Sequence, residues 1–290
     1  MSSIALGWYL FLKPYDYIIK FETNANPGVV EQSIKVRGYG NTNLTILNTN
    51  DDNHSILETL RFGDSVHIYN WRIIKKSKNL TQVTVGIKDQ NWLRSIMNKL
   101  KVPFVSTDFV KSSEKNVLNF MKNLKNHLKD FKITIVGVTD IPEKTLAYIQ
   151  VRKNQFNKAF GMMENSNFIN EELYKNKLEL DGPPMLEVIK WDKSNDSLIY
   201  NFGSPIKTNQ KLPSLNEIKY KKIPSRKALK AIFNGNYINS DRTWYALLEY
   251  ASENDLQVEE LPIEIFYNNP NMGGDPLNWK AEIYMPLKKY

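Results

Sequence analysis

The residues most suited to chemistry centre on a glutamate in the stretch LPIEIFYNNP, residues 261–270. This stretch alternates like a β-strand, which places Glu264 and Phe266 on one face and Ile263 and Ile265 on the other. Two hypotheses follow for the glutamate. Either its face meets water and Glu264 pairs with one of the many lysines, or the strand borders a cavity and Glu264 is the charge inside it.

The second hypothesis predicts a definite chemistry. A carboxylate surrounded by apolar groups is costly to ionise unless a cation or hydrogen bonds compensate. Beside aromatic rings it suits an organic cation, because the ring quadrupoles and the acid both attract positive charge. The same group could act as a general base on water. Glu264 is therefore a candidate binding residue, and it is the candidate catalytic residue if the protein is a hydrolase.

Aromatic side chains are the candidates for the walls of such a site. In the helix expected after Ser240 and Asp241, Trp244 lies on the apolar stripe, which favours a place in the core, whereas Tyr245 lies about 100° around the helix and could reach a groove. Each candidate could equally serve packing alone. The further candidate ligand-binding residues are Tyr237, Phe266, Tyr267, Trp279, Glu187 and Tyr148.

The composition argues against several other classes of chemistry. The 290 residues include no cysteine, which excludes disulfides, thiolate metal sites and cysteine nucleophiles. The three histidines, His54, His67 and His127, are scattered with no carboxylate at metal-ligand spacing. We therefore predict no metal site and no Ser-His-Asp triad. The glycine-containing stretch at 38–41 is too short for a phosphate loop, and no cofactor is predicted.

The formal net charge of +8 would suit an acidic partner such as nucleic acid or an anionic membrane. The lysines, however, are spread along the whole chain. The densest run, KYKKIPSRKALK at 219–230, is typical of an edge strand that lysines protect from pairing. No helix-turn-helix, zinc finger or RNA-binding motif accompanies it, so the sequence argues against direct contact with nucleic acid. A regulatory protein that contacts nucleic acid or a membrane through its basic surface stays open as a third hypothesis.

Residues 1–13 are expected to form an apolar arm or the remnant of a membrane-proximal segment. The stretch IALGWYLFL, residues 4–12, is uncharged but far shorter than the ~20 residues that span a bilayer. Trp8, Tyr9 and Lys13 are residue types that anchor helices at membrane interfaces. The expected location is therefore the cytoplasm or a membrane surface, with the arm as the point of membrane proximity.

The elements that must position these residues fall into two modules, and the fold class is α+β. Residues 14–132 read as a strand at 15–21, a helix that Asn26 caps, β-rich runs and a long helix at about 107–130. This order resembles the helix-grip fold of the START-like polyketide cyclase superfamily, also called SRPBCC. The resemblance implies an antiparallel sheet that holds an apolar ligand against the last helix.

Residues 133–290 contain one strand–helix–strand–strand unit twice, at 133–206 and 218–290. Set side by side, the two copies place Glu187 opposite Glu264. The polar, proline-containing segment at 207–217 reads as their connection. We expect the two units to be related by an approximate twofold axis, with a cleft between them.

These residues resemble the GyrI-like, or AraC-type effector-binding, family of small-molecule-binding domains. The duplicated unit carries the resemblance together with four stretches. These are FNGNYINSDRTWYALLEYASENDL at 233–256, LPIEIFYNNP at 261–270, DPLNW at 275–279 and AEIYMPL at 281–287.

The resemblance implies an aromatic groove with a buried acid that engages cationic or polar ligands, and the acid corresponds to Glu264. Some relatives are hydrolases. Relatives that regulate transcription usually carry a DNA-binding domain in front, where this chain has the START-like module. We therefore predict a non-enzymatic small-molecule sensor or carrier, with a hydrolase as the alternative.

Overall fold

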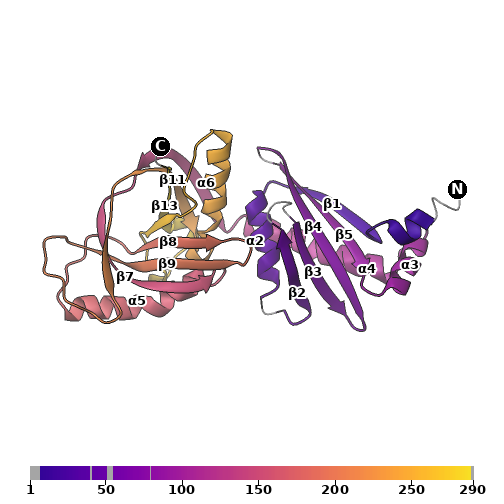
Figure 1. Cartoon of the computed structure of the whole chain (residues 1–290), viewed down its shortest axis with the longest axis horizontal. Helices are drawn as coiled ribbons and strands as arrows, with labels where there is room; N and C mark the ends of the chain where they lie inside the picture. The colour runs from indigo at the N-terminus through magenta and orange to yellow at the C-terminus, as the bar shows by residue number, and fades with distance from the viewer. Residues whose placement is uncertain (1–6, 40, 51–54, 79, 289–290) are drawn as a thin grey trace. The chain divides into compact units, whose positions relative to one another are not determined.

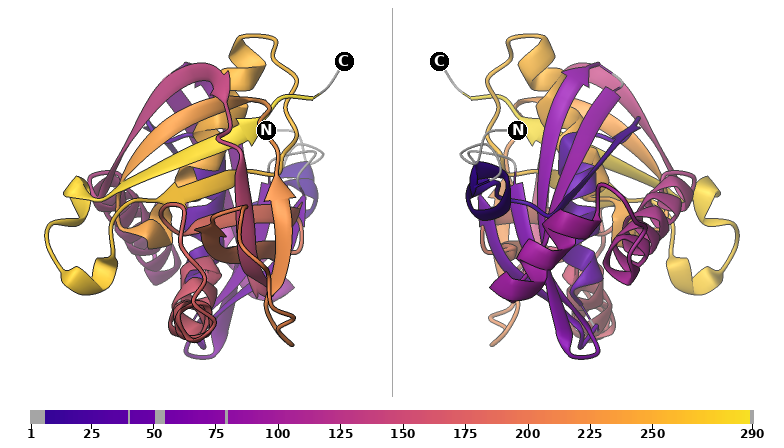
Figure 2. Two further views of the ribbon diagram at one scale, coloured as in Figure 1. Left: turned by 90° about the vertical axis from the view of Figure 1, so that its left-hand side faces the viewer. Right: turned by 90° about the vertical axis from the view of Figure 1, so that its right-hand side faces the viewer.

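The structure is a computed structural model that describes residues 7–39, 41–50, 55–78 and 80–288. The chain divides into two compact units, Met1–Leu128 and Lys129–Tyr290 (Figure 1 and Figure 2). Each unit has its own antiparallel sheet and its own helices.

The N-terminal unit is a five-stranded sheet in the order β1-β5-β4-β3-β2. Its strands are β1 (Tyr17–Thr23), β2 (Leu44–Asn50), β3 (Ser55–Phe62), β4 (Ser65–Ser77) and β5 (Leu80–Asp89). Its helices are α2 (Pro27–Arg37), α3 (Trp92–Lys101) and α4 (Asp108–His127). Asn26 caps α2 by accepting a hydrogen bond from the backbone N–H of Gly28 at 2.9 Å, which satisfies a free helix-end donor.

The long helix α4 packs on the inner face of this sheet. Phe120 of α4 contacts Phe21 of β1 and Trp71 of β4, with ring centroids 6.3 and 4.9 Å apart. Strands β3, β4 and β5 alternate between buried and more exposed residues, so one face of each is turned to the helix. The expected helix-grip arrangement of sheet and long helix is confirmed.

Residues 7–13 of the expected N-terminal arm pack on α3, whereas residues 1–6 lie outside the described part. A short π-helix, η1 (Trp8–Leu12), is fixed by Lys99, whose Nζ donates to the carbonyls of Leu10 (3.1 Å) and Lys13 (2.6 Å). Tyr9 returns a hydrogen bond to the Lys99 carbonyl at 3.1 Å. None of the described helices combines the length and the hydropathy that crossing a bilayer requires.

The C-terminal unit is an eight-stranded antiparallel sheet with two helices. Its first half contains β6 (Phe131–Asp140), β7 (Lys144–Asn154), α5 (Lys158–Lys175), β8 (Met185–Asp192) and β9 (Ser197–Ile206). Its second half contains β10 (Lys219–Ile223), β11 (Lys227–Gly235), η2 (Tyr237–Asn239), α6 (Arg242–Glu253), β12 (Ile263–Phe266), η3 (Pro270–Met272), η4 (Pro276–Asn278) and β13 (Lys280–Pro286).

The strand order of this sheet demonstrates the duplication. The order is β10-β7-β9-β8-β12-β13-β11-β6. Exchanging each strand for its counterpart in the other half (β6 with β10, β7 with β11, β8 with β12, β9 with β13) reverses the order and leaves the sheet unchanged. The expected pseudo-twofold symmetry is confirmed, and its axis passes between β8 and β12. The structure also shows that the first strand of each half, β6 or β10, pairs with a strand of the other half.

The expected equivalence of Glu187 and Glu264 is wrong. In the β8–β12 pairing, Ile263 lies opposite Glu187 and Glu264 lies opposite Leu186. Residues paired across two strands point to the same face, so Glu187 and Glu264 point to opposite faces. A twofold axis that exchanges two antiparallel strands is perpendicular to the sheet and keeps every side chain on its own face. The counterpart of Glu264 must therefore share the face of Leu186.

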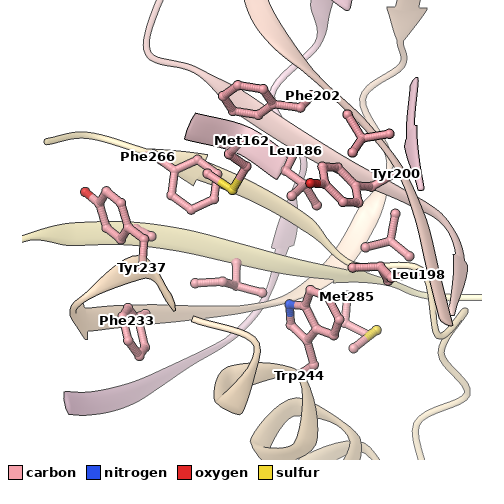
Figure 3. Close-up of a cluster of buried hydrophobic side chains, with 14 of the residues drawn as sticks. Met162, Leu186, Leu198, Tyr200, Phe202, Phe233, Tyr237, Trp244, Phe266 and Met285 are labelled. Carbon is pink, nitrogen blue, oxygen red and sulfur yellow. The ribbon is translucent and has the colours of Figure 1, made fainter. Parts of the chain in front are cut away.

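Both helices, α5 and α6, cover the same face of the sheet. The main core lies between them and the strands and draws Met162 from α5, Trp244 from α6, and Leu186 and Phe266 from the strands. Figure 3 shows these side chains turned toward one another from elements of both halves. Glu264 projects from β12 into this helix-covered face.

Candidate functional site

Glu264 is fully buried, and both of its carboxylate oxygens are hydrogen-bonded. Its Oε1 accepts from the indole Nε1 of Trp244 at 2.6 Å and from Nζ of Lys158 at 2.9 Å. Its Oε2 accepts from Lys158 Nζ at 2.8 Å and from the hydroxyl of Ser240 at 2.8 Å. The hypothesis of a solvent-facing glutamate is therefore wrong, and the carboxylate belongs to the interior.

The partner of this carboxylate is Lys158, the first residue of α5, which is also fully buried. Its ammonium group donates to both oxygens of Glu264 and to the hydroxyl oxygen of Ser240, at 2.6 Å. The three N–H bonds of a primary ammonium thus have three acceptors. The same nitrogen lies 5.0 Å from the centroid of the Trp244 ring, within the range of a cation–π contact.

The site joins the two halves of the unit. Lys158 comes from the first half, whereas Ser240, Trp244 and Glu264 come from the second. Tyr200 of β9 fixes the start of α5, because its hydroxyl donates to the Lys158 carbonyl at 2.8 Å. A buried ion pair is tolerated when the geometry is good and further hydrogen bonds satisfy both charges, and this site meets both conditions.

A second polar group lies beside the pair. Gln155 accepts from the indole of Trp191 at 2.9 Å and from the hydroxyl of Tyr245 at 3.2 Å, and its amide donates to Asp241. Trp191 also meets the rings of Trp244 and Tyr245 edge-on, with centroids 5.0 and 5.4 Å away. Gln155 and Trp191 therefore fix the rings of Trp244 and Tyr245, of which Trp244 contacts the ion pair.

Tyr237, Phe266 and Trp279 form a separate buried cluster of mutually tilted rings on the same face. The ring of Tyr237 lies 4.9 Å from Phe266 and 5.9 Å from Trp279, centroid to centroid. The Tyr237 hydroxyl donates to the carbonyl of Lys280 at 2.9 Å and accepts from the backbone N–H of Asn268 at 3.0 Å. Burial raises the pKa of the Tyr237 hydroxyl, and the Asn268 bond opposes the change. These rings contact one another and the backbone, and their expected role in ligand binding stays a prediction.

Three candidate residues lie on the opposite face of the sheet and do not reach Glu264. Glu187 binds Lys221 Nζ at 2.7 Å and accepts from Asn201 at 2.9 Å. Tyr148 packs against the smaller core that lies on that face. Tyr267 is 48% exposed. The expectation that they share a site with Glu264 is wrong, because strand alternation turns them away.

That opposite face has its own buried acid, Glu282 of β13. Burial raises its pKa, but hydrogen bonds from Lys280, Lys230, Tyr284 and Tyr267 outweigh this and lower the pKa of Glu282 to about 2. The two lysine nitrogens lie 2.8 and 3.0 Å from its oxygens. This carboxylate is already neutralised by surface lysines, so it is a structural ion pair.

Sequence reasoning missed Lys158 and Gln155, and gave no site role to Ser240. A signal for Lys158 exists, because it shares the helical stripe of Met162, Ile169 and Leu173, all of which are buried. A buried lysine at such a position needs an anionic partner. Gln155 and Ser240 precede helices and carry no comparable signal. Among the described residues, no group of three or more acidic or histidine side chains is placed to hold a metal ion.

A family model described as a GyrI-like small molecule binding domain matches residues 136–288, more than half of the chain. The chain belongs to the GyrI-like family. The GyrI-like domain coincides with the unit that contains Glu264 and its symmetric sheet. It is a small-molecule-binding domain, and a small molecule is accordingly a partner of this chain.

Several solved structures are similar to this chain. The C-terminal domain of EcmrR is 19% identical, with 55% of this chain and 99% of that chain covered and a TM-score of 0.45. SAV2435 bound to tetraphenylphosphonium is 11% identical, with 54% and 94% covered and a TM-score of 0.33. The di-domain ARO/CYC protein StfQ of the steffimycin biosynthetic pathway is 8% identical, with 94% and 85% covered and a TM-score of 0.22. The comparison with curated proteins found no match.

Proposed function

We propose that the GyrI-like unit senses or carries an organic cation that takes the place of the Lys158 ammonium on Glu264. The observation that supports this most strongly is the set of contacts around that ammonium. A carboxylate, a hydroxyl oxygen and an indole ring surround one positive nitrogen in the interior of a small-molecule-binding domain. These are the groups by which proteins recognise cationic ligands.

Lys158 is then an internal competitor of the ligand. Its ammonium is tethered to the first turn of α5, so it reaches Glu264 without any loss of translational freedom. A ligand must bring enough apolar contact with Trp244, Trp191 and Tyr245 to offset the displacement of this tethered group. The proposal therefore favours hydrophobic cations over small hydrophilic ones.

The hydrolase alternative has less support from this geometry. A general base needs a lone pair directed at a reacting water. Both oxygens of Glu264 already accept two hydrogen bonds each, from Lys158, Trp244 and Ser240. The same contacts that suit an ammonium group leave the carboxylate poorly placed to remove a proton.

Chemical rescue of Lys158→Ala tests the proposal. This variant keeps Glu264 but removes the tethered ammonium, and n-propylammonium supplies the missing three carbons and ammonium group from solution. We expect n-propylammonium to raise the melting temperature of Lys158→Ala and to leave that of the wild type unchanged. Tetraphenylphosphonium, a hydrophobic cation, should bind the variant at least tenfold more tightly than the wild type, a difference of about 1.4 kcal/mol.

Two controls make the result specific. Lys158→Ala/Glu264→Gln should respond to neither cation, because the acid is gone. Lys153→Ala breaks a partly exposed pair with Glu164, at 2.9 Å, and should behave like the wild type. Rescue that persists without the acid, or a Lys158→Ala variant that binds no cation, would show that Glu264 is not a ligand site.

A further inference from the structure

The helix α3 of the N-terminal unit has its apolar residues on the outside. At about 100° per residue, they fall within one arc of about 140° around the helix axis. They are Trp92, Leu93, Ile96, Met97 and Leu100. Ile96 is half-buried and the other four are exposed, Trp92 by 65% and Leu93 by 56%. A surface helix ordinarily turns such a stripe toward the core, and α3 does the opposite.

The polar side of α3 is the one that faces the unit. Ser95 donates to the buried carboxylate of Asp16 at 2.6 Å. Lys99 is the one buried residue of this fully described helix, and its ammonium donates to the carbonyls of Leu10 and Lys13. Rotating α3 to bury its apolar stripe would break these contacts and leave charges unpaired. The hydrogen bonds therefore hold the stripe outward.

The segments next to α3 add to its apolar surface. The short helix η1 packs against α3 (Figure 1). Phe11 and Leu12 of η1 are 66% and 71% exposed, and Phe104, in the loop after α3, is 86% exposed. The exposed apolar residues of η1, α3 and the loop at 102–106 are called the α3 surface below. Large exposed apolar patches on folded proteins mark interaction sites.

The segments that form the α3 surface carry mainly positive charge. Residues 7–13 and 88–106 contain five basic side chains and one acid. That acid, Asp89, is buried and lies 3.3 Å from the guanidinium of Arg94. Lys88 and Lys101 are exposed. A second copy of the chain on this surface would bring like charges together, which disfavours pairing. An anionic bilayer matches both the apolar residues and the charge.

We propose that α3, with η1 and the loop at 102–106, binds the surface of an anionic lipid bilayer. Because α3 is amphipathic, its apolar side lies in the headgroup region and its axis lies along the membrane plane. Trp8 and Trp92 are of the residue type that favours this region, and Lys88 and Lys101 interact with the lipid phosphates. The proposal is independent of Glu264, which belongs to the other unit.

Vesicle flotation with the full chain tests the proposal. One set of vesicles is phosphatidylcholine alone, and the other adds phosphatidylglycerol at a ratio of about 2:1. We expect the wild type to float with the mixed vesicles, and less so at high salt, because salt screens the lysines. Leu93→Glu/Met97→Glu places two carboxylates on the exposed stripe and should weaken binding at least about tenfold. Lys88→Glu/Lys101→Glu should remove the preference for phosphatidylglycerol.

Quenching of tryptophan fluorescence by brominated lipids locates the contact. Of the six tryptophans, Trp8 and Trp92 are exposed. The other four are buried or half-buried, and they are Trp71, Trp191, Trp244 and Trp279. We expect mixed vesicles of brominated lipid to quench the wild type. Trp8→Phe/Trp92→Phe keeps the apolar surface, so it should still bind the vesicles but lose the quenching.

Met163→Glu is the matched control. Met163 of α5 is 63% exposed and lies in the C-terminal unit, so this variant should bind vesicles like the wild type. Circular dichroism of each variant confirms that it is folded. A wild type that stays off both kinds of vesicle would overturn the proposal, and so would Leu93→Glu/Met97→Glu that floats like the wild type. Self-association of the wild type without lipid, abolished by Leu93→Glu/Met97→Glu, would instead make the α3 surface an interface between copies.

Discussion

Replacing Lys158 by methionine keeps most of the side-chain volume but removes the positive charge. The Glu264 carboxylate then stays buried with two hydrogen bonds, from Trp244 and Ser240. Removing one partner of a buried ion pair destabilises a protein by about 3–5 kcal/mol, since the other charge stays in the interior unpaired. Glu264→Gln should cost a similar amount by stranding the lysine. The double variant removes both charges, so we expect it to be more stable than the sum of the single changes implies, by roughly 2–3 kcal/mol.

Calorimetry of the full chain can follow this effect, because the two compact units can give separate transitions. For a unit of this size, 1 kcal/mol shifts the melting temperature by about 2–4 °C, so each single variant should melt roughly 10 °C below the wild type. The affected transition should be that of the C-terminal unit. Tryptophan fluorescence provides a second probe of unfolding, because the indole of Trp244 is hydrogen-bonded to the Glu264 carboxylate.

A double-mutant cycle on the partly exposed Lys153–Glu164 pair gives the baseline for the coupling energy. There the coupling should be at most about 1 kcal/mol, because solvent screens the charges. If the Lys158–Glu264 cycle gives the same small coupling, or if Lys158→Met melts at the wild-type temperature, the buried pair does not contribute as argued and the competitor role of Lys158 loses its physical basis.

Three further perturbations test the fold around both units. The folded-state pKa of Glu282, about 2, lies below its ordinary value of 4.5. The ionised carboxylate therefore contributes up to about 3 kcal/mol to the free energy of unfolding above pH 4.5, and this contribution is lost as the pH falls toward 2. In urea denaturation at a series of pH values, Glu282→Gln should reduce the loss of stability between pH 4.5 and 2. Gly203→Ala should cost about 3 kcal/mol or more in thermal unfolding, since a Cβ there would lie 1.9 Å from the backbone oxygen of Ala147, and an unchanged melting point would contradict this packing. Thr107→Ala removes the N-cap of α4 and should cost about 1 kcal/mol, whereas Thr107→Ser should restore the wild-type melting temperature.

The alternation and repeats visible in the sequence were sufficient to predict the duplicated sheet and the sheet-and-helix order of the first unit. The same alternation correctly put Glu264 on the face opposite Ile263. The alternation also indicated a second buried acid. Glu58 lies on the same strand face as Ile56 and Leu60, and all three residues are buried. An acid on the apolar face of a strand is therefore informative wherever it occurs.

The pairing of Glu187 with Glu264 failed for a definable reason. Aligning the two copies by local similarity does not take into account which face of the strand each side chain occupies. A shift of one residue along a strand moves a side chain to the other face. The sequence contains the alternation of each strand, but the register between β8 and β12 follows from the packing of both halves.

The sequence by itself determined the periodic elements and the duplication, because these depend on local spacing and on the burial of apolar faces. It left open whether Glu264 meets water. Only the tertiary structure decided that this acid lies in the interior and what neutralises it. Lys158 and Glu264 are separated by more than a hundred residues, and their contact depends on how α5 and β12 meet across the pseudo-twofold axis. The same holds for Arg37, Glu58 and Asn116, which come from α2, β3 and α4 and meet only when the sheet closes on its helix.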